Sequence, residues 1–247
     1  NFCGTVMAEV ASNVVGYKTE NMTTGKLNMH TVQFNQVGKN GFNLNEDLSI
    51  PNAFGSENWS SADQIRIWNP TTSGYQYFYF YDDGGESGWA DADTDEYFED
   101  AFDPLPAGTA FWYNARANEK KLDMTSSGEV DSDGDTTYVL TGGKLNMLGS
   151  PYPASYSLNN TDEIVFVNPI GSENWSSADQ IRIWDPATSG YKYFYFYDDG
   201  GESGWADADS DEYFEDCGYG AIQAGVAWWY NSRPNDKELK ITFKKTF

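Results

Sequence analysis

The feature that most constrains the fold of this chain is a long internal repeat. Residues Gly55–Asp100 recur as Gly171–Asp216, 116 positions later, and only four of these 46 positions differ. The sequence GKLNM at 25–29 recurs at 143–147 and extends the repeat on its N-terminal side. A unit of roughly 110–120 residues is long enough to bury a core of its own. The chain of 247 residues is therefore expected to form two similar domains.

Strand signals dominate both copies of the repeat. Gln64–Trp68, Tyr75–Tyr81 and Thr109–Asn114 alternate or are rich in β-favouring residues, and Gly, Pro, Asp and Ser cluster between them. Short strands with frequent turns predict an all-β fold with two tandem antiparallel β-sandwich or barrel-like domains. The expected boundaries are an N-terminal strand (donor or tether) at 1–20, domain 1 at 21–130, an acidic linker at 131–142 and domain 2 at 143–247.

Charge and cysteine content restrict the partners and the compartment. The net charge of −23 argues against nucleic acid and anionic membranes, both of which need a basic patch. No apolar run reaches the length of a transmembrane helix, so membrane insertion is not expected. The first residues, NFCGTV, are typical of a start exposed by cleavage, which favours a secreted protein. In an oxidising compartment Cys3 and Cys217 are expected to form a disulfide; two separate buried thiols are the alternative.

Several short motifs together resemble an uncharacterised family of secreted bacterial β-rich tandem-repeat proteins. The motifs are the NVVGY start at Asn13–Tyr17, the strands Asp63–Trp68 and Asp179–Trp184, the Pro106–Trp112 segment and the Gly149–Pro151 turn. The second half departs from the pattern, because Gln223 stands where the first half has Pro106. The resemblance implies a secreted, tandem β architecture and carries no known activity with it.

The acidic loops predict calcium sites. Alternating Asp residues present several oxygens to one hard cation, although the spacing does not match an EF-hand. A solvated acidic loop that keeps the protein soluble is the alternative. The candidate ligands are Asp91, Asp93, Asp95, Asp131, Asp133, Asp135, Asp207, Asp209 and Asp211.

Two terminal segments and two tyrosine ladders suggest self-assembly. A spare N-terminal strand can complete the sheet of another subunit, and head-to-tail contacts of this kind give filaments. The tyrosines that alternate along the repeated strand form a ladder on one face, either as an assembly surface or packed under a neighbouring loop. The candidate assembly residues are Val6, Val10, Tyr75, Tyr77, Tyr79, Tyr191, Tyr193, Tyr195, Leu239, Ile241 and Phe243.

Catalysis is not expected, whereas glycan binding is a real alternative to assembly. His30 is the single histidine, which leaves little for nucleophilic catalysis or a zinc site. Trp59 and Trp175 lie in the repeated ENWSSADQ segment, where indole, amide and carboxylate groups suit sugar recognition. Each tryptophan has a second interpretation as a plug of the core. The sequence thus predicts a non-enzymatic extracellular structural subunit that polymerises with itself at the cell surface. A secreted glycan-binding or adhesion protein is the alternative.

Overall fold

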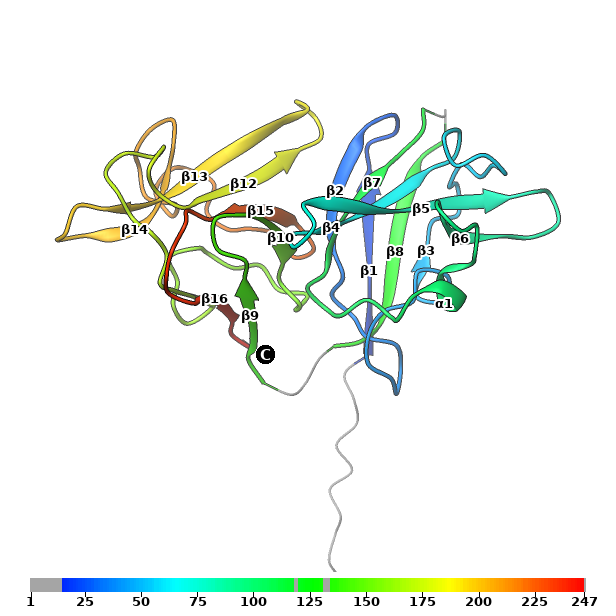
Figure 1. The fold of residues 1–247 in the computed structure, drawn as a ribbon, viewed down its shortest axis with the longest axis horizontal. Helices are drawn as coiled ribbons and strands as arrows, with labels where there is room; N and C mark the ends of the chain where they lie inside the picture. The colour runs from blue at the N-terminus through cyan, green and yellow to red at the C-terminus, as the bar shows by residue number, and fades with distance from the viewer. Residues whose placement is uncertain (1–14, 118–119, 131–133, 247) are drawn as a thin grey trace, which may run out of the picture.

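The chain folds into two β-sandwich units that lie side by side (Figure 1). The computed structural model describes residues 15–117, 120–130 and 134–246. Unit 1 consists of β1 (Val15–Met22), β2 (Leu27–Thr31), β3 (Leu48–Ser49), β4 (Gln64–Asn69), β5 (Gly74–Asp82), β6 (Ser87–Asp91), α1 (Phe98–Ala101), β7 (Ala110–Asn114) and β8 (Leu122–Glu129). Unit 2 consists of β9 (Thr136–Leu140), β10 (Leu145–Gly149), β11 (Ile164–Val167), β12 (Gln180–Asp185), β13 (Gly190–Asp198), β14 (Ser203–Asp207), β15 (Ala227–Asn231) and β16 (Leu239–Phe243).

Each unit packs a five-stranded sheet against a three-stranded sheet. The strand orders are β2-β7-β4-β5-β6 and β1-β8-β3 in unit 1, and β10-β15-β12-β13-β14 and β9-β16-β11 in unit 2. Every strand pairing is antiparallel. The prediction of an all-β fold with two repeated antiparallel domains is confirmed. No helix in the described ranges has the length and apolar character needed to cross a bilayer.

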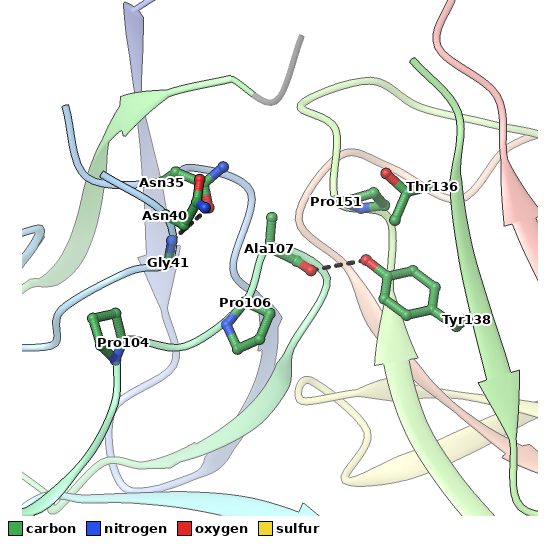
Figure 2. A pocket seen from close by; sticks show the side chains of 9 residues that line it. All are labelled: Asn35, Asn40, Gly41, Pro104, Pro106, Ala107, Thr136, Tyr138 and Pro151. Carbon is green, nitrogen blue, oxygen red and sulfur yellow. Dashed lines mark hydrogen bonds between the residues drawn. The ribbon is translucent and has the colours of Figure 1, made fainter. Parts of the chain in front are cut away.

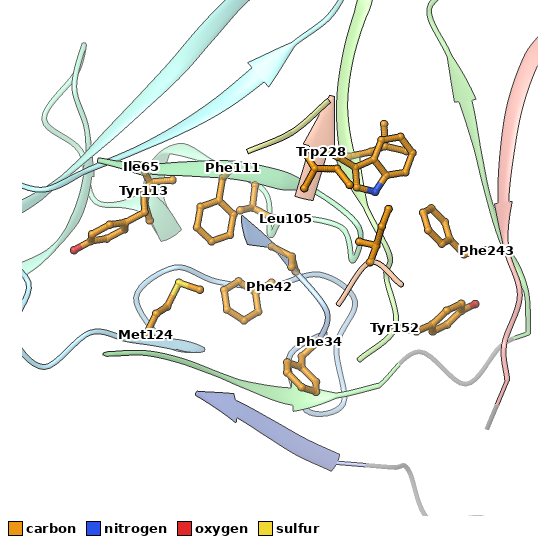
Figure 3. Packing of buried hydrophobic residues seen from close by; sticks show 14 of the residues in the cluster. Phe34, Phe42, Ile65, Leu105, Phe111, Tyr113, Met124, Tyr152, Trp228 and Phe243 are labelled. Atoms are coloured by element: carbon orange, nitrogen blue, oxygen red, sulfur yellow. The ribbon is translucent and has the colours of Figure 1, made fainter. Parts of the chain in front are cut away.

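The cores of the two units form one continuous hydrophobic cluster. In unit 1, Ile65 and Phe78 from the five-stranded sheet face Leu122 and Met124 from the three-stranded sheet, and all four are buried. Figure 3 shows this cluster running from Met124 in unit 1 to Trp228 and beyond in unit 2. Because apolar burial supplies most of the folding free energy, the two units are expected to stabilise each other.

A second apolar cluster joins the units with approximate two-fold symmetry; we call this contact the junction. The indole Nε1–H of Trp68 donates to the carbonyl oxygen of Leu145 at 2.8 Å, and that of Trp184 donates to the carbonyl oxygen of Leu27 at 2.8 Å. The ring contacts are also paired: Trp68 with Trp229 at 5.3 Å and Trp112 with Trp184 at 5.4 Å, both edge to face. Equivalent residues thus exchange equivalent contacts, as in an isologous dimer.

The backbone of the junction follows the same symmetry. Single antiparallel bridges link His30 to Val226 and Thr109 to Leu148, which are equivalent pairs from the two units. An isologous contact uses the same patch on both partners and is complete with two copies. The contact that joins unit 1 to unit 2 therefore cannot add a third unit, and any polymer must use another surface.

The structure corrects two of the expected boundaries. Residues 15–20, assigned to a separate N-terminal strand, belong to β1, which pairs with β8 from Val15↔Glu129 to Met22↔Leu122. Residues 136–140, assigned to the acidic linker, form β9 and pair with β16. The N-terminal strand was predicted but was assigned to neither unit, since the inner positions of β1 carry charged Lys18 and Glu20. Strand β9 was missed because it places Thr136 at a position where an apolar residue is expected. Each unit therefore begins with an edge strand of its three-stranded sheet.

Candidate functional site

The candidate site lies on the face of each five-stranded sheet that points away from the core; we call it the outer face. Alternation along β4 turns Ile65 inward and Arg66 and Trp68 outward. Register then sets Arg66 opposite Tyr77 and Trp68 opposite Tyr75 of β5. In unit 2 the same cross-strand pairs are Arg182 with Tyr193 and Trp184 with Tyr191.

A buried carboxylate fixes the loop that borders the outer face. Asp63 is fully buried; its Oδ2 accepts hydrogen bonds from the Phe54 N–H (2.8 Å) and the Tyr113 hydroxyl (2.6 Å), and its Oδ1 from the Arg116 N–H (2.6 Å). Such donors are what a desolvated carboxylate requires. The equivalent Asp179 accepts from Ile170, Tyr230 and Arg233. Burial raises the pKa of the Asp179 carboxyl, and these hydrogen bonds oppose the rise.

The loop held by this carboxylate presents a tryptophan to solvent in each unit. The side-chain amide of Gln64 donates to the carbonyl oxygen of Trp59 at 2.9 Å, and Trp59 is 45% exposed. Its ring lies 6.1 Å from that of Tyr77 with an angle of 58° between the planes. Trp175 is 47% exposed and lies 6.5 Å from Tyr193 at 61°. The interpretation that these two tryptophans plug the core is therefore wrong.

An arginine completes this arrangement. The guanidinium carbon of Arg66 lies 5.6 Å from the centre of the Tyr77 ring, and its Nη2–H donates to Gln64 Oε1 at 3.0 Å. Its Nε is buried and has no hydrogen-bond partner. Arg182 repeats this geometry over Tyr193 at 5.7 Å, also with an unpartnered Nε. We call Trp59, Tyr77 and Arg66, and likewise Trp175, Tyr193 and Arg182, the platforms.

Each platform combines aromatic surface with hydrogen-bond donors. Indole and phenol rings offer flat apolar faces, while a guanidinium stacked on tyrosine holds its donors in a fixed plane. The two tryptophans were predicted from the sequence as candidate site residues, whereas the arginines were not. Alternation in QIRIW does indicate them, because it places Gln, Arg and Trp on one face of the strand.

The tyrosine ladder is not one exposed surface. Tyr79 is 1% exposed, and its hydroxyl donates to Asp95 Oδ1 at 2.8 Å. Tyr195 is equally buried, and burial together with the hydrogen bond to Asp211 raises the pKa of its hydroxyl to about 12. Tyr75 and Tyr191 are half-buried at the junction. Of the six predicted assembly tyrosines, Tyr77 and Tyr193 are the ones left accessible on the platforms.

The terminal assembly residues do not form a docking edge. Leu239, Ile241 and Phe243 are buried in the core of unit 2, and β16 is the central strand between β9 and β11. The prediction that they dock onto another subunit is wrong, because both edges of β16 are already paired. Val6 and Val10 lie outside the described residues.

The acidic loops use several of their carboxylates to shape their own turns. Asp91 is buried, and its Oδ1 accepts from the N–H groups of Asp93 and Thr94, both at 2.9 Å. This is the turn-forming role of Asp in a loop. Among the described residues no group of three or more His, Cys, Asp or Glu side chains is arranged to hold a metal ion. Calcium binding stays a prediction.

The remaining predicted ligands are dispersed. Asp207 repeats the turn and forms an ion pair with Lys192, whose Nζ also lies 3.6 Å from Asp209. Asp211, like Asp95, accepts a tyrosine hydroxyl. Asp135 forms an ion pair with Lys244 at 2.8 Å, and that pairing holds the pKa of its carboxyl below the usual value. Asp131 and Asp133 lie outside the described residues.

Only one of the two cysteines predicted to form a disulfide lies in the described part of the chain. Cys217 is a half-buried free thiol whose Sγ–H donates to the carbonyl oxygen of Phe214 at 3.2 Å. Cys3 lies outside the described residues, so the disulfide stays a prediction.

A cavity of about 430 Å³ lies between the units and is the second candidate site (Figure 2). Tyr138 of unit 2 borders it and donates its hydroxyl hydrogen to the carbonyl oxygen of Ala107 in unit 1 at 2.8 Å. The lining residues are Asn35, Asn40, Gly41, Pro104, Pro106, Ala107, Thr136, Tyr138 and Pro151. None is a carboxylate, a base or a thiol, so the lining offers amides and hydroxyls but no strong acid–base group.

Comparison of this chain with protein-family models, with curated proteins and with solved structures finds no match. Its function has to be argued from its own surface.

Proposed function

We propose that this chain is a secreted, non-enzymatic protein that binds glycans, either at a cell surface or in the extracellular space. The observation that carries the proposal is the platform: a half-exposed tryptophan beside a tyrosine and an arginine, built identically in both units. Exposed aromatic groups near polar donors are the usual signature of a binding surface. The C–H face of a pyranose packs on such rings, and its hydroxyl groups accept guanidinium hydrogen bonds.

The buried carboxylates support this proposal because they make the platforms rigid. Asp63 and Asp179 each fix a loop through three donors at 3.0 Å or less. A preorganised aromatic group loses little conformational entropy when a ligand binds. Binding of a ligand would bury the exposed rings of Trp59 and Trp175, whereas a purely structural role does not explain why these two large rings are held in solvent.

Affinity electrophoresis in gels that contain neutral polysaccharides (hydroxyethylcellulose, xylan, galactomannan and a β-1,3-glucan) tests the proposal. The native chain should be retarded by at least one of these polymers, and the double variant Trp59→Ala/Trp175→Ala should migrate freely. Tyr17→Ala is the matched control, because Tyr17 is 78% exposed on β1 and lies outside the platforms. Equal retardation of the double variant and the native chain would refute the proposal.

Self-assembly into an extracellular filament or layer is the second candidate function. The observation that favours it is the edge strand β1, which within the described part of the chain pairs on one side only and exposes Val15 (62%) and Tyr17 (78%). An unprotected edge can accept a strand from another molecule. Sedimentation and electron microscopy over a concentration series test this candidate, with Tyr17→Lys as the variant that should block polymers. Monomers at every concentration, with and without calcium, would exclude it.

A further inference from the structure

The two platforms are connected through the junction by further aromatic rings. On β5 the ring of Tyr77 lies 6.0 Å from that of Tyr75, and on β13 the ring of Tyr193 lies 6.1 Å from that of Tyr191. Tyr75 and Tyr191 both pack on the apolar cluster of the junction. Two tryptophans connect them across the junction. The ring of Trp68 lies 5.0 Å from Tyr75 and 5.3 Å from Trp229 of unit 2, and the ring of Trp184 lies 5.0 Å from Tyr191 and 5.4 Å from Trp112 of unit 1.

The result is one connected aromatic surface rather than two isolated patches. It runs through Trp59, Tyr77 and Tyr75 in unit 1 and through Tyr191, Tyr193 and Trp175 in unit 2, with Trp68 and Trp184 between the two halves, and we call it the aromatic track. Within each unit successive ring centres are 6.0–6.5 Å apart. This step is of the order of one pyranose ring along an extended polysaccharide. The track is continuous with the junction, so its two halves are held in fixed relative positions.

The tilt of the rings favours a single chain over a flat surface. Within each unit, neighbouring planes from the tryptophan of the platform to the tyrosine at the junction meet at angles of 56–61°. A crystalline polysaccharide surface needs rings that share one plane, whereas a free chain whose residues rotate along its axis meets successive faces at an angle. The track therefore fits a soluble, extended chain.

The charge around the track selects against acidic chains. Asp83 accepts a hydrogen bond from the hydroxyl of Tyr81, which follows Tyr77 and Tyr79 along β5, at 3.3 Å, and Asp199 accepts one from Tyr197 on β13 at 3.2 Å. Glu57 and Glu173 are exposed and precede Trp59 and Trp175 by two residues. The chain as a whole carries −23. These carboxylates repel a polyanion, and the guanidinium groups of Arg66 and Arg182 each already donate to a glutamine, so an uncharged polymer is the complementary occupant.

We infer that the aromatic track is one binding site for a single linear, neutral polysaccharide with equatorial linkages, which crosses the junction and contacts both platforms. Equatorially linked chains are extended and present a C–H face on each residue. The inference rests on the proposed glycan binding and makes it specific in class, length and stoichiometry. A chain that contacts both platforms gains affinity because the second contact is intramolecular.

Titration calorimetry of the full chain with β-1,4-linked gluco-, xylo- and manno-oligosaccharides tests the inference. From tetrasaccharide to octasaccharide the affinity should rise at least about tenfold, and the stoichiometry should fall from two ligands to one. Two octasaccharides that bind with the tetrasaccharide affinity would overturn the continuous track and leave the glycan-binding proposal standing. If the polymers retain the native chain in gels but alginate and polygalacturonate do so equally, the neutral class is wrong.

Single variants give the matched comparison. Trp59→Ala and Trp175→Ala should each lower the octasaccharide affinity by about tenfold, because the exposed tryptophan of one platform is removed in either case. The tetrasaccharide should still bind to the intact platform with unchanged affinity and a stoichiometry of one. Tyr17→Ala should alter neither titration. An octasaccharide affinity that falls in only one of the two tryptophan variants would overturn the shared site.

Discussion

The two flanks of the junction occupy equivalent positions but have different chemistry. On one flank Tyr138 of β9 donates its hydroxyl hydrogen to Ala107, beside Gly108. On the other, Lys18 of β1 donates to the carbonyl oxygen of Ala224, beside Gly225. Both glycines have positive φ (85° and 81°), and a Cβ at either would overlap the partner side chain.

The charged flank extends further into the junction. Lys18 Nζ lies 2.9 Å from Glu20 Oε1, and the Glu20 Oε2 lies 3.4 Å from His30 Nδ1. Desolvation opposes ionisation of Glu20, but His30 and Lys18 outweigh it and lower its pKa to about 2. The repeated strands therefore form the symmetric part of the junction, whereas the non-repeated strands β1 and β9 supply the side chains that make the two flanks chemically different. Only one flank is therefore expected to respond to pH.

The largest expected effects come from the symmetric framework. Trp68→Ala and Trp184→Ala should each lower the free energy of unfolding by about 3 kcal/mol, because each removes a packed indole and its hydrogen bond across the junction. Urea unfolding at neutral pH measures both. If the two losses of unfolding free energy differ by much more than about 1 kcal/mol, the two tryptophans are not energetically equivalent and the junction is not two-fold symmetric.

Glu20→Gln should lower stability by up to about 3 kcal/mol at neutral pH. The folded pKa of about 2 lies below the ordinary value of 4.5, so the stabilisation is present above pH 4.5 and is lost as the pH falls towards 2. Unfolding measured over this range should show a steeper acid decline in the native chain than in the variant. Parallel pH profiles would contradict the role of the charged flank.

Tyr138→Phe should cost about 1 kcal/mol, since it removes one hydrogen bond to Ala107 and keeps the ring. The loss should be the same at pH 4 and pH 7, because the opposite flank contains the ionisable cluster. Thermal unfolding of this variant beside Glu20→Gln compares the two flanks directly. A pH-dependent loss for Tyr138→Phe would remove the distinction between them.

The smallest effect is expected in the acidic loops, where the two units differ at one partner. Lys192 pairs with Asp207 in unit 2, whereas Gln76 bonds Asp91 in unit 1. Lys192→Gln gives Asp207 the same kind of partner that Asp91 has and should change stability by less than about 1 kcal/mol, because Lys192 is partly exposed. Thermal unfolding at low and high salt measures it. A larger loss would mean that the ion pair, and not the turn, holds this loop.

Much of the fold could be predicted, because the repeat indicates two similar units and the period-two alternation of side chains indicates each strand from its own residues. Gln64–Trp68 and Tyr75–Tyr81 form strands as their alternation indicates, and Phe78 points into the core. The pairing of β1 within unit 1 and the presence of β9 were not predicted, because their inner positions carry Lys18, Glu20 or Thr136. Their burial is compensated by partners from distant segments, such as Ala224 for Lys18.

The candidate site could be predicted only in part, for a related reason. The sequence marks Trp59 as an aromatic residue in a polar loop, but its exposure depends on Asp63, Phe54 and Arg116, which come together only in the folded chain. Arg66 follows from strand alternation. The junction does not follow from the sequence, because the repeat says that two units exist and nothing about which patches they share.

A ¹⁵N-edited NMR titration with a neutral β-1,4-linked hexasaccharide shows whether both platforms bind glycan, because each indole Nε1–H reports on its own surroundings. The resonances of Trp59 and Trp175 should shift together, while those of buried Trp89 and Trp205 should stay in place. Shifts that gather on the acidic loops or on β1, with the two platform indoles unmoved, would contradict glycan binding at the platforms.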